Sequence, residues 1–208
     1  RVRALHVDEA EVERAIRMSL ADRPISFLVD LGTGTGRVLE LLGDLYERGL
    51  GIDTNQAMLA YARANLDRAQ CTNAQVRQGD LHNLALDDGC ADVVVMHQVL
   101  HFMPDPAKAI IEATRLLRPG GRLLIVDFAP HELEYLREQY AHERLGFADT
   151  QIAGWFTEAG LDPLSSQSLA PSGANHAEIL TVSLWLAQRV GDADGAGSTV
   201  LANQMEPA

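Results

Sequence analysis

One stretch decides the fold of this chain: Val29-Asp30-Leu31-Gly32-Thr33-Gly34-Thr35-Gly36-Arg37. An apolar run over residues 25–31 leads into it, and an amphipathic run over residues 38–45 leads out. This pattern predicts a buried strand, a glycine turn and a helix that opens on the turn. Glycines let a ligand approach the backbone closely, and a helix N-terminus presents free N–H groups. The sequence therefore predicts a site for a nucleotide-like ligand at this turn.

The spacing of the glycines narrows the class of ligand. Dinucleotide sites use the pattern Gly-x-Gly-x-x-Gly. Here the third glycine, Gly36, comes one residue early, and Arg37 occupies its usual place, which disfavours a nicotinamide-dependent dehydrogenase. Asp30 precedes Gly32 by two residues and would repel a pyrophosphate, whereas a cationic ligand would be attracted. A turn whose glycines serve packing alone is the alternative.

Composition bounds the class of protein. The 208 residues carry 29 acidic and 17 basic side chains, a net charge of −12, so the chain alone has no electrostatic footprint for nucleic acid or for an acidic membrane surface. No apolar run is long enough to span a membrane, and the charged N-terminus lacks the apolar core of a signal peptide. Cys71 and Cys90 form no Cys-x-x-Cys pattern. We therefore expect a cytoplasmic protein with reduced thiols and no bound metal.

Strands and helices alternate along residues 25–128. We expect strands over residues 25–31, 49–53, 74–78, 91–96 and 122–128, and helices over residues 8–21, 36–47, 54–67 and 105–117. The alternation predicts an α/β fold with a Rossmann-like, doubly wound, mostly parallel sheet of seven strands. In such a sheet, ligands bind at the carboxyl ends of the strands.

Beyond the fifth strand the pattern changes. We expect a helical insert with helices over residues 133–145 and 149–159, followed by an antiparallel hairpin of strands over residues 161–169 and 179–186 with a turn at 171–175. The composition from residue 191 is that of a flexible linker. The expected organisation is an N-terminal helical segment (1–24), a ligand-binding domain (25–190) and a flexible tail (191–208).

Two further acidic residues lie at ends of expected strands. Asp53 ends the second strand, where a carboxylate can accept hydrogen bonds from both hydroxyls of a ribose. Asp80 follows the third strand and can accept from an adenine amino group, with Leu81 packing on the ring. A helix-terminal role for Asp53 and a turn role for Asp80 are the alternatives. Met58 either covers the adenine or ribose or belongs to the helix core.

Four segments in this order resemble the class I S-adenosylmethionine (SAM)-dependent methyltransferases: residues 29–37, 51–53, 79–81 and 117–123. The resemblance covers roughly residues 25–186 and implies SAM as the cofactor. It implies that the glycine loop holds the methionyl part, the second acid the ribose and the third acid the adenine. The ammonium and sulfonium of SAM suit an acidic turn. The implied cofactor-binding residues are Asp30, Gly32, Thr33, Gly34, Asp53, Thr54, Met58, Gly79, Asp80, Leu81 and His97.

Segments toward both ends resemble the methyltransferase half of bacterial regulators in which an ArsR-type (arsenic-repressor-type) winged helix-turn-helix precedes that half. The segments are residues 3–9, 127–137 and 142–147. The start at Arg1 instead of a methionine fits the loss of the preceding half. We find no DNA-reading helix in the sequence itself, so DNA is expected as a partner only through an upstream domain absent from this chain.

Two histidines follow the fourth strand, where acceptor-side residues often lie in this family. His97 and His101 are four residues apart and share a face if the segment is helical. Either is a candidate for taking a proton from the acceptor. Alternatively, His97 lines the cofactor pocket and His101 is a surface or capping residue. A metal pair lacks an evident third ligand.

The methyl acceptor is not specified by a motif. Met96-His97-Gln98-Val99 replaces the Asn-Pro-Pro-Tyr type of motif, which disfavours nucleobase amino groups, and two cysteines do not supply the set that arsenite methyltransferases use. We expect a small-molecule acceptor. The alternative is a non-catalytic sensor of SAM or S-adenosylhomocysteine (SAH) in a DNA-binding regulator. The insert residues His131, Tyr135, Tyr140 and His142 either cover the acceptor pocket or form an interdomain or homodimer surface.

Overall fold

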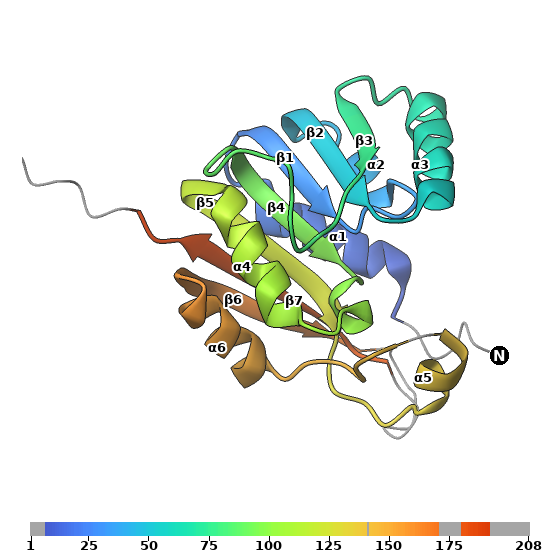
Figure 1. Ribbon diagram of the computed structural model, residues 1–208, viewed down its shortest axis with the longest axis vertical. Helices are drawn as coiled ribbons and strands as arrows, with labels where there is room; N and C mark the ends of the chain where they lie inside the picture. Colours follow the sequence, from blue (N-terminus) through green and yellow to red (C-terminus); the bar gives the residue numbers. More distant parts are fainter. Residues whose placement is uncertain (1–6, 141, 171–179, 192–208) are drawn as a thin grey trace, which may run out of the picture.

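The computed structural model describes residues 7–140, 142–170 and 180–191 (Figure 1). Its strands are β1 (Ile25–Leu31), β2 (Tyr46–Asp53), β3 (Ala74–Gln78), β4 (Ala91–His97), β5 (Leu117–Phe128), β6 (Leu161–Leu169) and β7 (Val182–Arg189). Its helices are α1 (Glu9–Leu20), α2 (Arg37–Leu41), α3 (Gln56–Arg68), α4 (Pro106–Leu116), α5 (Tyr135–Tyr140), α6 (Asp149–Glu158) and the short 3-10 helix η2 (Leu100–Phe102).

The strands form one seven-stranded sheet in the order β3-β2-β1-β4-β5-β7-β6. The first five strands pair in parallel, and β7 pairs antiparallel with both β5 and β6. The predicted doubly wound sheet with its antiparallel hairpin is therefore confirmed. Because β1 and β4 are neighbours while β2 lies on the other side of β1, the carboxyl end of β1 is the point where the strand order reverses.

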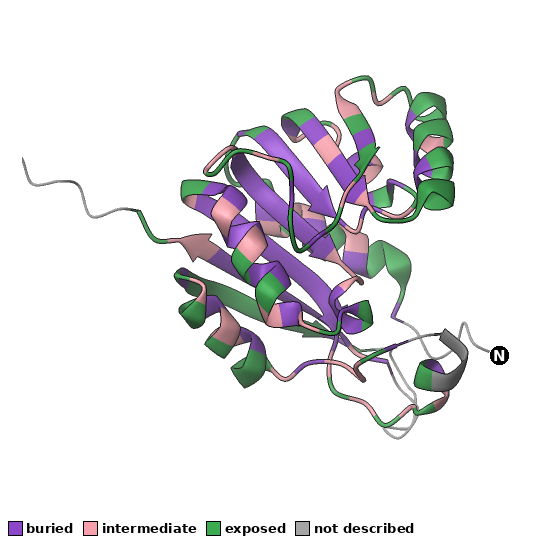
Figure 2. Cartoon of the chain, in the orientation of Figure 1, coloured by how far each residue is buried: buried purple, intermediate pink, exposed green. Residues whose placement is uncertain are grey.

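Helices cover both faces of the sheet and create two apolar cores. On one face α1, α2 and α3 pack against alternate strand residues such as Val93 and Val95. On the other face α4 and α6 pack against Val94 and Met96. Successive strand side chains point to opposite faces, so a strand buried on both sides reads as the continuous apolar run of β4. Figure 2 shows the buried strands between outer helix faces that are largely exposed.

Three helices begin at capping side chains. The Asp8 carboxylate accepts a hydrogen bond from Ala10 N, and the Asn55 side chain accepts from the N–H groups of residues 57 and 58. Asp105 caps α4, with Pro106 in its first turn. These caps satisfy N–H groups that the first turn of a helix leaves free. The cap of α3 is Asn55 and not the preceding Thr54.

The predicted helix over residues 36–47 is wrong in its second half, since α2 ends at Leu41 and β2 begins at Tyr46. The Tyr46 hydroxyl is buried and donates to Leu39 O at 2.8 Å. Asn73 donates to the carbonyls of Gly43 and Tyr46, both at 2.9 Å. These side chains bind carbonyls of residues 39–46, and tertiary contacts therefore override the helical pattern.

The helix expected over residues 133–145 is also shorter, because the second half of the insert bonds to η2 and to the end of β5. Glu143 N and Arg144 N both donate to His101 O, and Phe147 N donates to Phe128 O at 2.9 Å.

β5 begins five residues earlier than predicted, and β7 runs to Arg189. The turn expected at 171–175 lies outside the described residues, as does the tail from residue 192. No helix in the described ranges is long and apolar enough to cross a membrane.

Candidate functional site

The glycine loop is fastened to the end of β2. Gly32 N and Thr33 N both donate to Ile52 O, at 2.8 and 3.0 Å. Gly32 has φ +75°, and a side chain there would collide with Val99. Position 32 therefore requires glycine for two reasons, the left-handed backbone and the close packing of Val99. Val99 was not singled out from the sequence, because a valine just after a strand gives no signal of its contact.

Gly34 lies at the open part of the same loop. Its φ is +51°, and a Cβ built there would meet no atom within 4 Å. Its N–H donates to the Asp53 carboxylate at 2.9 Å, while the other carboxylate oxygen accepts from Asn55 N at 2.8 Å. The half-exposed Asp53 is thus held rigidly beside empty space and retains lone pairs for a ligand hydroxyl. The arrangement is that of a cradle between the ends of β1 and β2.

The third acidic residue, Asp80, is close in sequence to the end of β3 and is more exposed than Asp53. Gly79 N donates to Asp53 O at 3.1 Å, which links the ends of β2 and β3. Asp80 accepts from His82 N at 2.9 Å, and this hydrogen bond is the main cause of the lowered pKa of Asp80. Leu81 is buried in the core beneath, among the residues that pack on α4.

Two predicted cofactor residues lie at the start of α3. Met58 is 41% exposed, so the expectation that it packs inward in the helix core is wrong. Exposure leaves it free for the alternative role, covering a ligand. Thr54 is exposed, and its carbonyl accepts from Gln78 Nε2 at 3.0 Å. The cofactor-binding roles of both residues stay predictions.

Asp30 is the most unusual group at this edge. It is 1% exposed, and neither of its carboxylate oxygens has a hydrogen-bond partner among the described residues. The pKa of Asp30 is raised to about 7, mainly by burial; the Thr33 hydroxyl lowers this pKa, and the charge of Asp53 adds to the increase. That hydroxyl lies close enough to influence Asp30 but makes no hydrogen bond of regular geometry. Buried oxygens without a hydrogen-bond partner lower the stability of a protein. The carboxylate oxygens of Asp30 therefore suggest that a ligand supplies a cationic partner.

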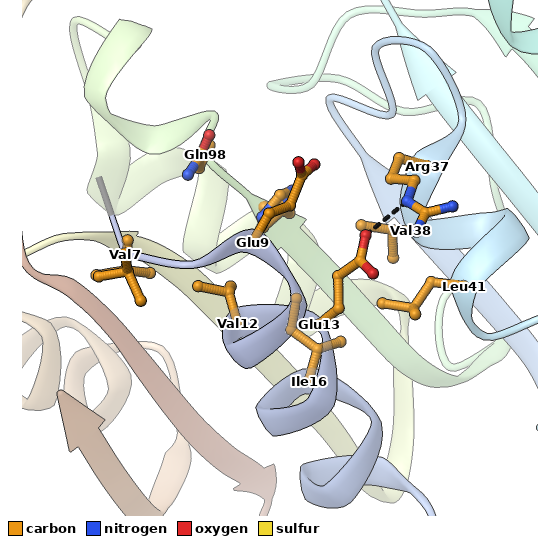
Figure 3. Close-up of a pocket in the computed structure, with 11 residues that line it drawn as sticks. Val7, Glu9, Val12, Glu13, Ile16, Arg37, Val38, Leu41 and Gln98 are labelled. Carbon is orange, nitrogen blue, oxygen red and sulfur yellow. Dashed lines mark hydrogen bonds and ion pairs between the residues drawn. The ribbon is translucent and has the colours of Figure 1, made fainter. Parts of the chain in front are cut away.

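A cavity of about 220 Å³ opens beside the glycine loop, between α1, the start of α2 and the end of β4 (Figure 3). His97 and Gln98 form one wall, and Arg37, which directly follows Gly36, forms another. Gln98 has φ +51°, a conformation that costs a non-glycine residue energy and is often retained at functional sites. Burial lowers the pKa of His97, so its imidazole is neutral near pH 7.

Sequence reasoning missed the polar side chains that α1 brings to this cavity. Glu9 and Glu13 line it, and Arg37 Nε donates to Glu13 at 2.6 Å. On the sequence both glutamates belong to the charged face of an amphipathic helix, which is normally a solvated face. No periodicity distinguishes a glutamate beside a cavity from one in open solvent.

His101 is not on the surface, and the alternative that put it there is wrong. It is 2% exposed, and its Nδ1 lies 2.7 Å from an oxygen of the buried Asp127. It does not share a helical face with His97, since residues 97–101 pass from β4 through a bend into η2. Of these two histidines, His97 lines the cavity and His101 does not.

The insert packs on this buried pair. The ring of His142 lies 4.1 Å from that of His101 and stacks at 6.0 Å on Phe128. Burial, with smaller contributions from His101 and His131, lowers the pKa of His142 to about 4, so the His142 imidazole packs as a neutral aromatic ring. The described residues contain no group of three or more His, Cys, Asp or Glu side chains arranged to hold a metal ion.

The chain is similar to known methyltransferases. A family model described as a methyltransferase domain matches residues 29–125. A probable S-adenosylmethionine-dependent methyltransferase of Mycolicibacterium smegmatis is 31% identical over 67% of this chain and 59% of the relative. The trans-aconitate 2-methyltransferase of Deinococcus radiodurans is 32% identical over 80% of this chain and 61% of the relative. The chain thus spans about three fifths of the length of these relatives.

Solved methyltransferase structures have the same fold. The solved structure of geranyl diphosphate methyltransferase in complex with SAM superposes with a TM-score of 0.74 at 14% identity, covering 88% of this chain and 86% of that one. The family model thus matches residues 29–125 to a methyltransferase domain, and the solved structure shows that the sheet around them has the same fold. The site fits SAM on its own features, the open cradle at Gly34 and the unpartnered Asp30 and Thr33 oxygens.

We predict that Gly34→Ala lowers the affinity for SAM at least about 10-fold, because the new methyl group enters the space above the loop. Gly160→Ala is the matched control, since Gly160 has φ +79°, also faces open space and lies at the end of α6. Both variants are expected to lose about 1–2 kcal/mol of stability from the left-handed backbone. Equal SAM affinities in a calorimetric titration would count against the cradle.

We predict that Asp30→Asn stabilises the ligand-free protein by roughly 1–3 kcal/mol at pH 8 and much less at pH 5. The folded-state pKa of Asp30 lies above the unfolded value, so its contribution to the free energy of unfolding falls as pH rises through about 7. The same substitution should weaken SAM binding at pH 8, where the carboxylate is ionised. Denaturant unfolding and SAM titration at both pH values check this, and an unchanged stability difference between them would refute it.

We predict that His101→Ala lowers the free energy of unfolding by about 2–4 kcal/mol, since it leaves a cavity and removes the side-chain partner of Asp127. His82→Ala serves as the control, because His82 is exposed and its one bonded partner among the described residues is the exposed Asp80. Denaturant unfolding measures both. A loss below about 0.5 kcal/mol in His101→Ala, the range of ordinary surface changes, would contradict the buried pairing.

Proposed function

We propose that this domain transfers the methyl group of SAM to a small-molecule acceptor that enters the cavity beside the glycine loop. The observation that carries the proposal is the cavity of about 220 Å³ with His97 on its wall. It adjoins the cofactor loop through Arg37, yet none of the residues that line it is Asp53, Asp80 or a loop glycine. A second compartment beside the cofactor is what a transferase needs and what a sensor does not.

The protein residues have separate roles in this proposal. Bound SAM supplies the electrophilic methyl group, so the protein needs to align the acceptor and to remove a proton where the acceptor carries one. Asp53 holds the ribose, Asp80 the adenine and Asp30 the methionyl ammonium. His97 is the candidate proton acceptor, because its ring is neutral near pH 7 and makes no hydrogen bond with another described side chain. The relative from Deinococcus radiodurans is named for a small acceptor, which supports this acceptor class.

We further propose that the chain forms the C-terminal half of an ArsR-type transcriptional regulator in the cytoplasm. The support is the resemblance of residues 127–137 and 142–147 to the methyltransferase halves of such proteins. DNA binding would then belong to the preceding winged helix-turn-helix, and a homodimer would suit a two-fold symmetric operator. Sequencing upstream of the codon for Arg1 tests this link, and a short methionine-started N-terminus would refute it.

The second candidate function is a non-catalytic SAM or SAH sensor in such a regulator. It is favoured by the burial of His101, which leaves His97 as the only one of the two histidines that lines the cavity. The two functions differ in the fate of the methyl group. Incubation with methyl-labelled SAM and a protein-free extract of small metabolites separates them: label in a new small molecule supports the enzyme, and label retained in SAM at full occupancy supports the sensor.

We predict that Asp53→Ala weakens both SAM and SAH about 10- to 100-fold, since a charged acceptor for ribose hydroxyls is worth about 1.5–3 kcal/mol. Both ligands share the ribose, so the loss should be similar for the two. Asp67→Ala, at the end of α3, is the control and should bind both ligands like the unmodified chain. Calorimetry gives the four affinities, and an unaltered Asp53→Ala affinity would exclude the ribose role.

A further inference from the structure

The cavity beside the loop has an apolar floor. Six aliphatic side chains from α1, α2, β7 and the segment before α1 line it: Val7, Val12, Ile16, Val38, Leu41 and Val182. Its volume of about 220 Å³ exceeds the roughly 150 Å³ in which a buried apolar cavity accommodates benzene. The space therefore suits an acceptor with one ring or a short branched chain, most of whose surface is apolar.

The polar rim of the same cavity carries an excess of negative charge. Arg37 is its one cation among the described lining residues, and it is already paired with Glu13 at 2.6 Å and with Glu40 at 3.2 Å. The hydrogen bond to Glu13 is the main cause of the raised pKa of Arg37. Glu9 lies one helical turn before Glu13 on α1 and pairs with no described residue. Figure 3 shows Glu9 extending between Gln98 and the Arg37–Glu13 pair.

This distribution of charge discriminates between acceptor classes. An acceptor carboxylate would face the free, exposed Glu9 and would find the Arg37 charge already compensated, and like charges placed side by side cost binding energy. A cationic nitrogen would instead pair with Glu9 while its apolar part rests on the aliphatic floor. Neutral acceptors would gain the apolar contact alone.

We propose, on the basis of the function proposed above, that the methyl acceptor is a small, mostly apolar primary or secondary amine that Glu9 selects and His97 deprotonates. The amine enters as an ammonium, which has no lone pair. The N–H bond breaks, its electrons stay on nitrogen, and the proton goes to the imidazole of His97 and then to solvent. The nitrogen bonds to the methyl carbon while the carbon–sulfur bond breaks onto sulfur, giving SAH and the methylated ammonium.

The test uses three probes of one shape: benzylamine, benzyl alcohol and benzoate. Each is titrated by calorimetry into the chain saturated with SAH, so the readout is binding and needs no turnover. We expect benzylamine to bind at least about 10-fold more tightly than benzyl alcohol, and benzoate to bind most weakly. With SAM in place of SAH, benzylamine should produce SAH and N-methylbenzylamine.

Matched variants assign the preference to one carboxylate. Glu9→Gln should weaken benzylamine about 10-fold and leave benzyl alcohol and SAH unchanged. Glu11→Gln is the control, since Glu11 lies in the first turn of α1 and is exposed like Glu9, but it does not line this cavity. It should bind all three probes like the unmodified chain.

Four results would overturn the amine proposal: no binding at millimolar benzylamine, binding of benzoate equal to that of benzylamine, benzylamine binding unaffected by Glu9→Gln, or competition between benzylamine and SAH. The last would assign the cavity to the cofactor itself. Failure of the unmodified chain to bind SAH and SAM at all would instead refute the proposed function, so the two failures are distinguishable.

Discussion

The hydrogen bonds that tie the glycine loop to the end of β2 set the geometry of everything at this edge of the sheet. Ile52 O accepts from two successive loop N–H groups, and the Asp53 carboxylate accepts from Gly34 N. These bonds fix the end of β1 against the end of β2 before any ligand is present. They also leave Gly34 facing open space, where a cofactor can touch the backbone. A rigid cradle of this kind binds without first having to order a loop.

Next to this rigid frame the protein keeps one costly group. Asp30 is buried without a hydrogen-bond partner, and such a group opposes folding when it is ionised. Natural proteins accept this cost at functional sites, where the missing partner is the ligand. The neighbouring Thr33 hydroxyl is unpartnered as well, so a single ammonium would satisfy both groups. An ionised Asp30 thus lowers the stability of the free protein, and a cationic ligand would remove this cost.

Much of the architecture was predictable because it follows local rules. The apolar run of β4, the glycine turn and the caps Asp8 and Asp105 each reveal their role within a few residues of sequence. Where the prediction failed, a distant side chain decided the outcome: Asn73 binds the carbonyls of Gly43 and Tyr46 and converts the end of a predicted helix into strand. The insert was misjudged for the same reason, since its backbone bonds to His101 instead of to itself.

The site, like the fold, combines features that local sequence predicts with features that depend on distant contacts. The acids at the ends of β1 and β2 were predictable because parallel strands bring their carboxyl ends together. The cavity was not, since Glu9 and Glu13 resemble any exposed glutamate of an amphipathic helix, and His101 resembles His97 until burial separates them. His97 lines the cavity, whereas His101, only four positions later, is held by Asp127 inside the fold. No rule of sequence spacing predicts that difference.

We propose that the loop at Gly34, together with Asp30 and Asp53, forms the SAM site. A crystal structure of the chain with SAH tests it most directly. We expect both ribose hydroxyls within about 3 Å of the Asp53 carboxylate and the amino group of the ligand beside Asp30 and Thr33. A ligand bound elsewhere, or one whose ribose does not contact Asp53, would contradict it.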